Sequence, residues 1–96
     1  MTESVDITAV RSNWQSRGFS CDVWSDPPGR VWNDYRHAVD EVVMVLEGKV
    51  EFDIAGRVIR PAPGEEVLIP AGTLHTVRNL GSTTSRWLYG YQGTAG

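Results

Sequence analysis

Two histidines and one glutamate in this sequence have the residue types and the setting of a metal site. His75 opens an apolar run, and His75, Val77 and Asn79 fall on one face of a strand with a period of two. A histidine on the inner face of a small β structure needs a partner, because burying an unpaired polar group is costly. A metal ion is a common partner for a neutral imidazole. The other candidate ligands are His37, the second of the two histidines, and Glu41, which begins another apolar run.

Two imidazoles and one carboxylate with open positions form the facial arrangement that suits Fe(II) and also accepts Mn, Ni, Co or Zn. Tyr35 lies two residues before His37, on the same face of an extended chain. Its phenolate could complete the coordination sphere, as tyrosine does on some ferric centres. The same phenol could instead orient a bound molecule or supply a proton, which would make Tyr35 the candidate catalytic residue.

Each of these residues also has a reading without a metal. His75 could be a hydrogen-bonded histidine of a pocket. Glu41 could be a salt-bridged carboxylate in the wall of a barrel, with Arg36 or Arg78 as its partner. The joint presence of His37, Glu41 and His75 favours the metal.

The segments that must position these side chains have the signals of short β-strands. Pro70 presets φ for a turn, and Gly72 supplies a φ that other residues avoid, shortly before His75. Strand signals separated by turns at intervals of about 8–12 residues predict an all-β sandwich or barrel. We expect one short helix over residues 5–17, followed by strands near 19–23, 31–37, 41–46, 50–54, 58–59, 67–69, 75–80 and 86–91.

The aromatic residues are candidates for the wall of a binding site. Trp87, Tyr89 and Tyr91 share one face of the last predicted strand, where they form core, a dimer interface or a pocket wall for a flat or apolar small molecule. Trp24 and Trp32 flank a double-proline break where the mouth of a barrel could lie. We therefore take Trp24, Trp32, Trp87 and Tyr89 as the candidate substrate-binding residues.

Composition excludes several classes of partner. The formal net charge is −3 and no basic run occurs, so no nucleic acid is expected. No apolar run approaches the roughly 18–20 residues of a membrane span, and no signal peptide is evident, so we expect no membrane contact. Cys21 is the single cysteine, which excludes an internal disulfide and favours the cytoplasm. The 96 residues are enough for one domain and one modest core.

The chain resembles the cupins, through two motifs. The first family motif is matched at every spacing and departs at one residue, because Tyr35 stands where the family has a histidine. The second is matched at every position. The residues that carry the resemblance are Gly29, Tyr35, His37, Glu41 and Gly48 in the first motif, and Gly64, Pro70, Gly72, His75 and Asn79 in the second.

The resemblance implies one cupin domain over residues 1–96, with an antiparallel β-barrel or jelly roll from about residue 19 to residue 91, and motifs at 29–48 and 64–79. It implies a divalent transition metal (Fe, Mn, Ni or Zn) on Tyr35, His37, Glu41 and His75. The expected function is small-molecule chemistry of the dioxygenase, isomerase or lyase kind. The alternative is a non-catalytic module that binds or senses a small ligand, with or without metal. Because the family often dimerises by sheet packing, we also expect a homodimer.

Overall fold

The computed structural model describes residues 5–35 and 37–93, but the side chains of residues 33–35 lie outside the description. Within this part of the chain, one helix is followed by eight strands. The elements are α1 (Ile7–Ser16), β1 (Asp22–Asp26), β2 (Val31–Tyr35), β3 (Glu41–Glu47), β4 (Val50–Ile54), β5 (Arg57–Ile59), β6 (Glu66–Ile69), β7 (His75–Asn79) and β8 (Ser85–Tyr91).

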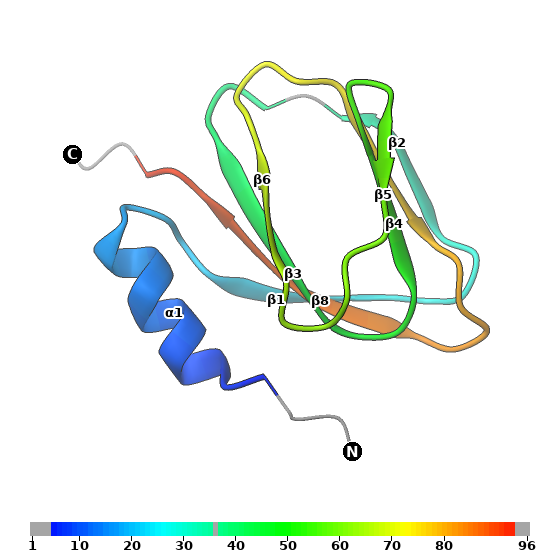
Figure 1. The fold of residues 1–96 in the computed structure, drawn as a ribbon, viewed down its shortest axis with the longest axis horizontal. Helices are drawn as coiled ribbons and strands as arrows, with labels where there is room; N and C mark the ends of the chain where they lie inside the picture. The colour runs from blue at the N-terminus through cyan, green and yellow to red at the C-terminus, as the bar shows by residue number, and fades with distance from the viewer. Residues whose placement is uncertain (1–4, 36, 94–96) are drawn as a thin grey trace.

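The strands form two four-stranded antiparallel sheets, with the orders β1-β8-β3-β6 and β2-β7-β4-β5. Consecutive strands from β1 to β4 alternate between the sheets in the order one, two, one, two, which is the winding of a jelly roll. Figure 1 shows the two sheets on opposite sides of the molecule, with β3 and β6 facing β4 and β5. The predicted all-β jelly roll with one N-terminal helix is therefore confirmed.

Local turn chemistry accounts for the tight connections. Ala55 and Gly56 have φ values of 53° and 85°, so both central residues of the β4–β5 hairpin are left-handed, as a type I′ turn requires. Gly48 has φ of 95° between β3 and β4, and a Cβ there would lie 2.7 Å from Oγ of Ser85. A glycine at position 48 therefore allows both the positive φ and the close approach of Ser85.

The main core lies between the sheets. It contains seven buried side chains, drawn from both sheets, and the aromatic ones are Phe52 and Trp87. The first five residues of β3, Glu41–Val45, are all buried, as its continuous apolar run predicts for a strand covered on both faces. The charged residue at the start of this buried segment, Glu41, thus sits where only a partnered carboxylate is stable.

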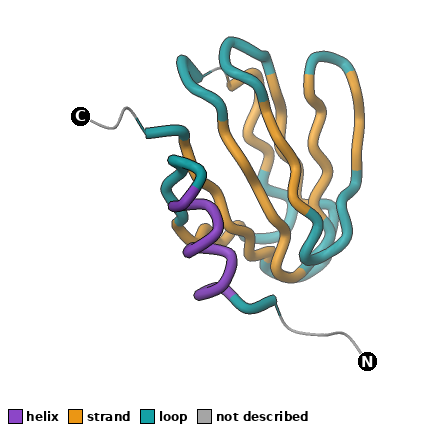
Figure 2. The backbone as a smooth tube through the Cα atoms, turned by 60° about the vertical axis from the view of Figure 1, so that its left-hand side comes forward, coloured by secondary structure: helices purple, strands orange, loops and turns teal. Residues whose placement is uncertain are grey.

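A second cluster covers the outer face of the first sheet. Helix α1 packs Trp14 against Val42, Met44, Leu88 and Cys21, and Figure 2 shows the helix on the outside of the strands. Cys21 is therefore a core residue of this outer cluster, and it does not line the cavity described below.

The carboxylate of Glu66 ties α1 to β6. It accepts a hydrogen bond of 2.8 Å from Nε1 of Trp14, and it forms a bidentate pair with Arg17 at 2.8 Å. Hydrogen bonds from Arg17 are the main reason why the pKa of Glu66 is lowered. Asp6 caps the helix by accepting a hydrogen bond from the backbone N–H of Ala9.

The predicted element boundaries needed small corrections. The strand expected at residues 19–23 begins at Asp22, with Phe19 forming only an isolated bridge to Gln92, because the chain first leaves α1 through a turn. The helix is shorter than predicted, Ile7–Ser16. Among the described residues, no helix is long and apolar enough to cross a membrane. The homodimer stays a prediction.

Candidate metal centre and aromatic cavity

Three segments bring the candidate ligands together. Glu41 is the first residue of β3 in one sheet, His75 is the first residue of β7 in the other, and His37 lies in the loop between β2 and β3. The loop and the turn before β7 are joined, because the backbone N–H of Gly72 donates to the carbonyl oxygen of His37 at 2.8 Å. The two predicted motifs are thus held in register by a direct hydrogen bond between them.

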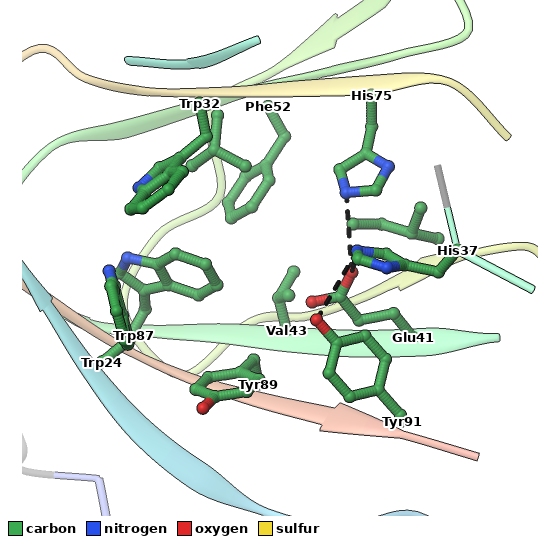
Figure 3. A pocket seen from close by; sticks show the side chains of 12 residues that line it. Trp24, Trp32, His37, Glu41, Val43, Phe52, His75, Trp87, Tyr89 and Tyr91 are labelled. Carbon is green, nitrogen blue, oxygen red and sulfur yellow. Dashed lines mark hydrogen bonds and ion pairs between the residues drawn. The ribbon is translucent and has the colours of Figure 1, made fainter. Parts of the chain in front are cut away.

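The three side chains converge on one point (Figure 3). Oε1 of Glu41 lies 3.4 Å from Nε2 of His37 and 3.6 Å from Nε2 of His75. One donor atom from each residue lies within 4.8 Å of the others, a spacing that could hold a metal ion. Among the described residues, the structure therefore brings together three of the four predicted ligands.

The candidate metal centre is buried, so an unpaired charge there would be costly. Glu41 and His75 are each 4% exposed, and Oε1 of Glu41 makes no hydrogen bond with the described residues. Burial raises the pKa of Glu41 to about 7. Burial, followed by the neighbouring charge of His75, lowers the pKa of His37. Two imidazoles beside a buried carboxylate oxygen without a hydrogen bond are a donor set that fits a divalent cation.

The orientation of His75 is set by a hydrogen bond behind it. Nδ1 of His75 lies 3.2 Å from the carbonyl oxygen of Thr73. Because a carbonyl oxygen only accepts, this contact places a proton on Nδ1, and in the neutral ring the lone pair is then on Nε2, which faces Glu41. Such a contact fixes the tautomer of a metal-ligating histidine. Gly72, with φ of 75°, shapes the turn that brings Thr73 into place.

Tyr35, the fourth predicted ligand and the predicted catalytic residue, has a side chain outside the described part of the structure. Its backbone belongs to β2 and pairs with His75. Another phenol does lie beside the centre. Oη of Tyr91 is 3.5 Å from Nε2 of His37, and the two rings are 4.8 Å apart. The prediction placed Tyr91 on the face shared with Trp87 and Tyr89 but did not include it in the site.

Glu41 does not have the alternative partner expected for it at Arg78. Nη1 of Arg78 instead bonds to Oε1 of Glu51 at 3.0 Å, and Glu51 also pairs with Arg60 at 3.0 Å. These contacts, led by the hydrogen bond from Arg60, lower the pKa of Glu51. Arg36 lies outside the described residues.

The candidate ligands stand at one end of a cavity of about 190 Å³ between the sheets. All four predicted substrate-binding residues line it, and so does Tyr91. The lining residues are Trp24, Trp32, His37, Glu41, Val43, Phe52, Ile69, His75, Val77, Trp87, Tyr89 and Tyr91. Figure 3 shows the tryptophans at the end opposite the histidines.

One residue behind this wall was not predicted. Asp26, at the end of β1, is 2% exposed and accepts hydrogen bonds from the indole N–H groups of Trp24, Trp32 and Trp87. The proximity of Asp26 to Trp24 in the sequence is a weak signal for such a pair, but Trp87 is 61 residues away. The sheet pairing of β1 with β8 brings Trp87 to this carboxylate, and Trp32 reaches it from β2 in the other sheet.

Asn79 has a structural role. Its Nδ2 donates to the carbonyl oxygens of Asp26, Pro27 and Thr83, and its Oδ1 accepts from the backbone of Gly81. It therefore ties the end of β7 to the β1–β2 connection and to the turn before β8.

Comparison with known proteins agrees with the jelly roll and its two motifs. A family model described as a cupin domain matches residues 22–91, which is more than half of the chain. The chain belongs to the cupin domain family. A search of curated protein sequences found no match.

Solved cupin structures have a similar fold. The cupin domain of Cnp3 from Schizosaccharomyces pombe has a TM-score of 0.71 and 20% identity, over 78% of this chain and 56% of that one. DMSP lyase DddQ from Ruegeria pomeroyi has a TM-score of 0.71 and 25% sequence identity, and the match covers 81% of this cupin and 40% of the lyase. A salicylate 1,2-dioxygenase from Pseudaminobacter salicylatoxidans has a TM-score of 0.72 and 21% sequence identity, and the match covers 78% of this cupin and 22% of the dioxygenase. This cupin thus matches little more than half of the length of the first relative, and less than half of the other two. The feature it shares with them is the fold.

Proposed function

We propose that this cupin holds a divalent transition metal on His37, Glu41 and His75 and presents it to a small molecule in the aromatic cavity. The observation that carries the proposal is the buried Oε1 of Glu41, which makes no hydrogen bond with the described residues and faces two imidazole nitrogens at 3.4 and 3.6 Å. A buried anionic oxygen with no donor is costly, and a cation shared with the two nitrogens removes that cost.

When bound, a metal ion of this kind would supply Lewis acidity or oxygen activation to the small molecule. The protein's own groups would do the rest. The carbonyl of Thr73 keeps the lone pair of His75 directed toward Glu41. The aromatic and aliphatic wall excludes water from the cavity and binds the apolar part of the ligand. Oη of Tyr91, beside His37, is placed to donate a proton or a hydrogen bond to a ligand at the centre.

The backbone of Tyr35 pairs with that of His75, which places residue 35 next to a candidate ligand. We assign it the place of the fourth family ligand or of a phenol that handles a proton. The class of reaction stays open among oxidation, isomerisation and elimination. Two of the similar structures are enzymes, a lyase and a dioxygenase.

Ligand binding without turnover is the second candidate function. The observation that favours it is the exchange of the family histidine for Tyr35, which leaves one imidazole fewer for the metal, while the cavity and its aromatic wall are still present. Substrate consumption by the metal-loaded protein separates the two functions.

The direct test is elemental analysis of protein purified without chelators. We expect one transition metal ion per chain in the wild type and a loss of it in His75→Ala and in Glu41→Gln. Glu47→Gln is the matched control, because Glu47 lies in the same strand but is exposed and pairs with Arg86. A metal content that is unchanged in both site variants would refute the metal centre.

A further inference from the structure

At the tryptophan end of the cavity, the indole N–H groups bond to a carboxylate that does not line the cavity. Oδ1 of Asp26 accepts from Nε1 of Trp24 at 2.6 Å and of Trp32 at 3.0 Å, and Oδ2 accepts from Trp32 at 3.0 Å and Trp87 at 3.4 Å. An indole has one polar hydrogen, so these bonds use the donor of each ring. Asp26 itself is not among the lining residues, and the indoles therefore offer the cavity their carbon surfaces.

These aromatic rings meet one another at steep angles and do not stack face to face. Trp24 meets Trp32 at 68° with centroids 5.7 Å apart, and it meets Tyr89 at 82° and 6.3 Å. Trp87 meets Tyr89 at 61° and 5.9 Å. Rings at steep angles around one space can turn their negative π faces toward a common guest. This is the arrangement of the aromatic cages that bind quaternary ammonium groups.

The charges near this end also favour a cation. Among the described lining residues there is no lysine or arginine, whereas Glu41 lines the cavity and the Asp26 carboxylate contacts three indoles. A carboxylate that accepts from an indole N–H polarises the ring and makes its face more negative. Trp32 already attracts one cation, since Cζ of Arg30 lies 4.2 Å from its ring centroid, and Arg30 is exposed and not a lining residue.

The kind of cation follows from the hydrogen bonding. A primary ammonium carries three donors, and an indole ring has no acceptor atom, so burying an ammonium among the three indoles would leave its donors unpaired. A quaternary ammonium or a tertiary sulfonium has no such donors and an apolar envelope. The cavity volume of about 190 Å³ restricts the guest to a small head group.

We propose that the compartment formed by Trp24, Trp32, Trp87 and Tyr89 is a subsite for an onium head group, a small quaternary ammonium or tertiary sulfonium. Asp26 is its positioning residue, because it orients three of the four rings. The same cavity reaches the candidate metal centre, so a ligand would place a metal-binding oxygen at His37, Glu41 and His75. That second part rests on the proposed function, whereas the onium subsite does not.

The test compares choline with its neutral isostere, in which a quaternary carbon replaces the nitrogen. Both are titrated into the metal-free wild-type protein, with a chelator present, and followed by tryptophan fluorescence and calorimetry. We expect choline to bind roughly tenfold more tightly than the isostere, because a desolvated cation–π contact is worth that ratio or more. Equal or tighter binding of the isostere, or no binding of either at millimolar concentration, would overturn the subsite.

Variants separate the cage from the fold and from the metal. Trp24→Leu removes the half-exposed ring and should abolish the preference for choline, whereas Trp24→Phe should keep part of it. Asp26→Asn should weaken choline binding more than isostere binding, with Asp22→Asn as the control for a charge lost from the exposed face of the same strand. Unchanged choline preference in Trp24→Leu would contradict the cage.

His75→Ala distinguishes this proposal from the metal centre. We expect His75→Ala to lose metal and to keep the preference for choline, because His75 is at the opposite end of the cavity from the tryptophans (Figure 3). A wild type that holds metal but shows no preference for choline would refute the subsite alone. A wild type without metal that still prefers choline would refute the metal centre alone.

Discussion

Oε1 of Glu41 and Nε2 of His75 lie 3.6 Å apart although their strands belong to different sheets of the jelly roll. Both residues are the first of their strands, and their contact bridges the two sheets at one end of the cavity. A cation bound there would join β3 to β7 and oppose the separation of the sheets. The same pair, left without a cation, holds a buried carboxyl group whose pKa is raised to about 7.

Metal-free protein should lose stability as the pH rises toward 7 through this one group. The folded pKa of Glu41 is above the ordinary value of 4.5, so its contribution is fully present below pH 4.5 and is lost as the pH rises through about 7. The loss is on the order of 3 kcal/mol, since one pKa unit corresponds to about 1.4 kcal/mol. Urea unfolding in the presence of a chelator, at a series of pH values, measures it.

Glu41→Gln isolates this effect from the other titrating groups. The difference in unfolding free energy between the wild type and this variant should change with pH, whereas the difference for the exposed Glu47→Gln should stay flat. Adding a divalent metal at pH above 7 should stabilise the wild type and not Glu41→Gln. A pH-independent difference for Glu41→Gln would contradict the raised pKa.

Tyr35→His should strengthen metal binding, because it restores the imidazole that the cupin motif has at this position. The expected gain in affinity is on the order of tenfold, about 1.4 kcal/mol. Tyr35→Phe should leave the affinity unchanged if the phenol acts on the ligand, and should lower it if the phenolate binds the metal. Competition with a chromogenic chelator gives the three affinities. Equal affinity of the wild type and Tyr35→His would show that residue 35 does not reach the metal.

Asn79→Ala should destabilise the protein by about 3 kcal/mol, because it leaves three carbonyl oxygens and one backbone N–H without their partner. Asn79→Asp keeps the size and the acceptor for Gly81 but sets a carboxylate against three carbonyl oxygens, so it should be at least as damaging. Chemical denaturation of both variants is the measurement. Wild-type stability of Asn79→Asp would mean that these donor bonds contribute nothing.

Gly90→Ala should be far more damaging than Gly72→Ala. A Cβ at position 90 would overlap the carbonyl oxygen of Ser20 and come within 3.0 Å of the Trp14 ring, so α1 and the segment before β1 would have to move. A Cβ at Gly72 meets nothing within 4 Å, and its φ of 75° costs about 1–2 kcal/mol. Melting temperatures of the two variants give the comparison, and equal losses would contradict the close approach at Gly90.

The sequence by itself determined the parts of this cupin that depend on neighbours along the chain. Ala55-Gly56 specified a hairpin, the apolar run after Glu41 specified a strand covered on both faces, and the alternation of His75, Val77 and Asn79 specified an inner face. The motif spacing placed His37, Glu41 and His75 among the four predicted ligands, and these three side chains lie together in the structure.

Only the tertiary structure decided the contacts between residues that no local period relates. Asp26 meets Trp87 because β1 pairs with β8, and Glu66 meets Trp14 because α1 docks on the outer face of a sheet. Tyr91 reaches His37 for the same reason, since the register of β8 on β3 sets its place opposite Glu41. Buried polar groups must find partners wherever packing brings them, and that choice depends on how the sheets pair and stack in three dimensions.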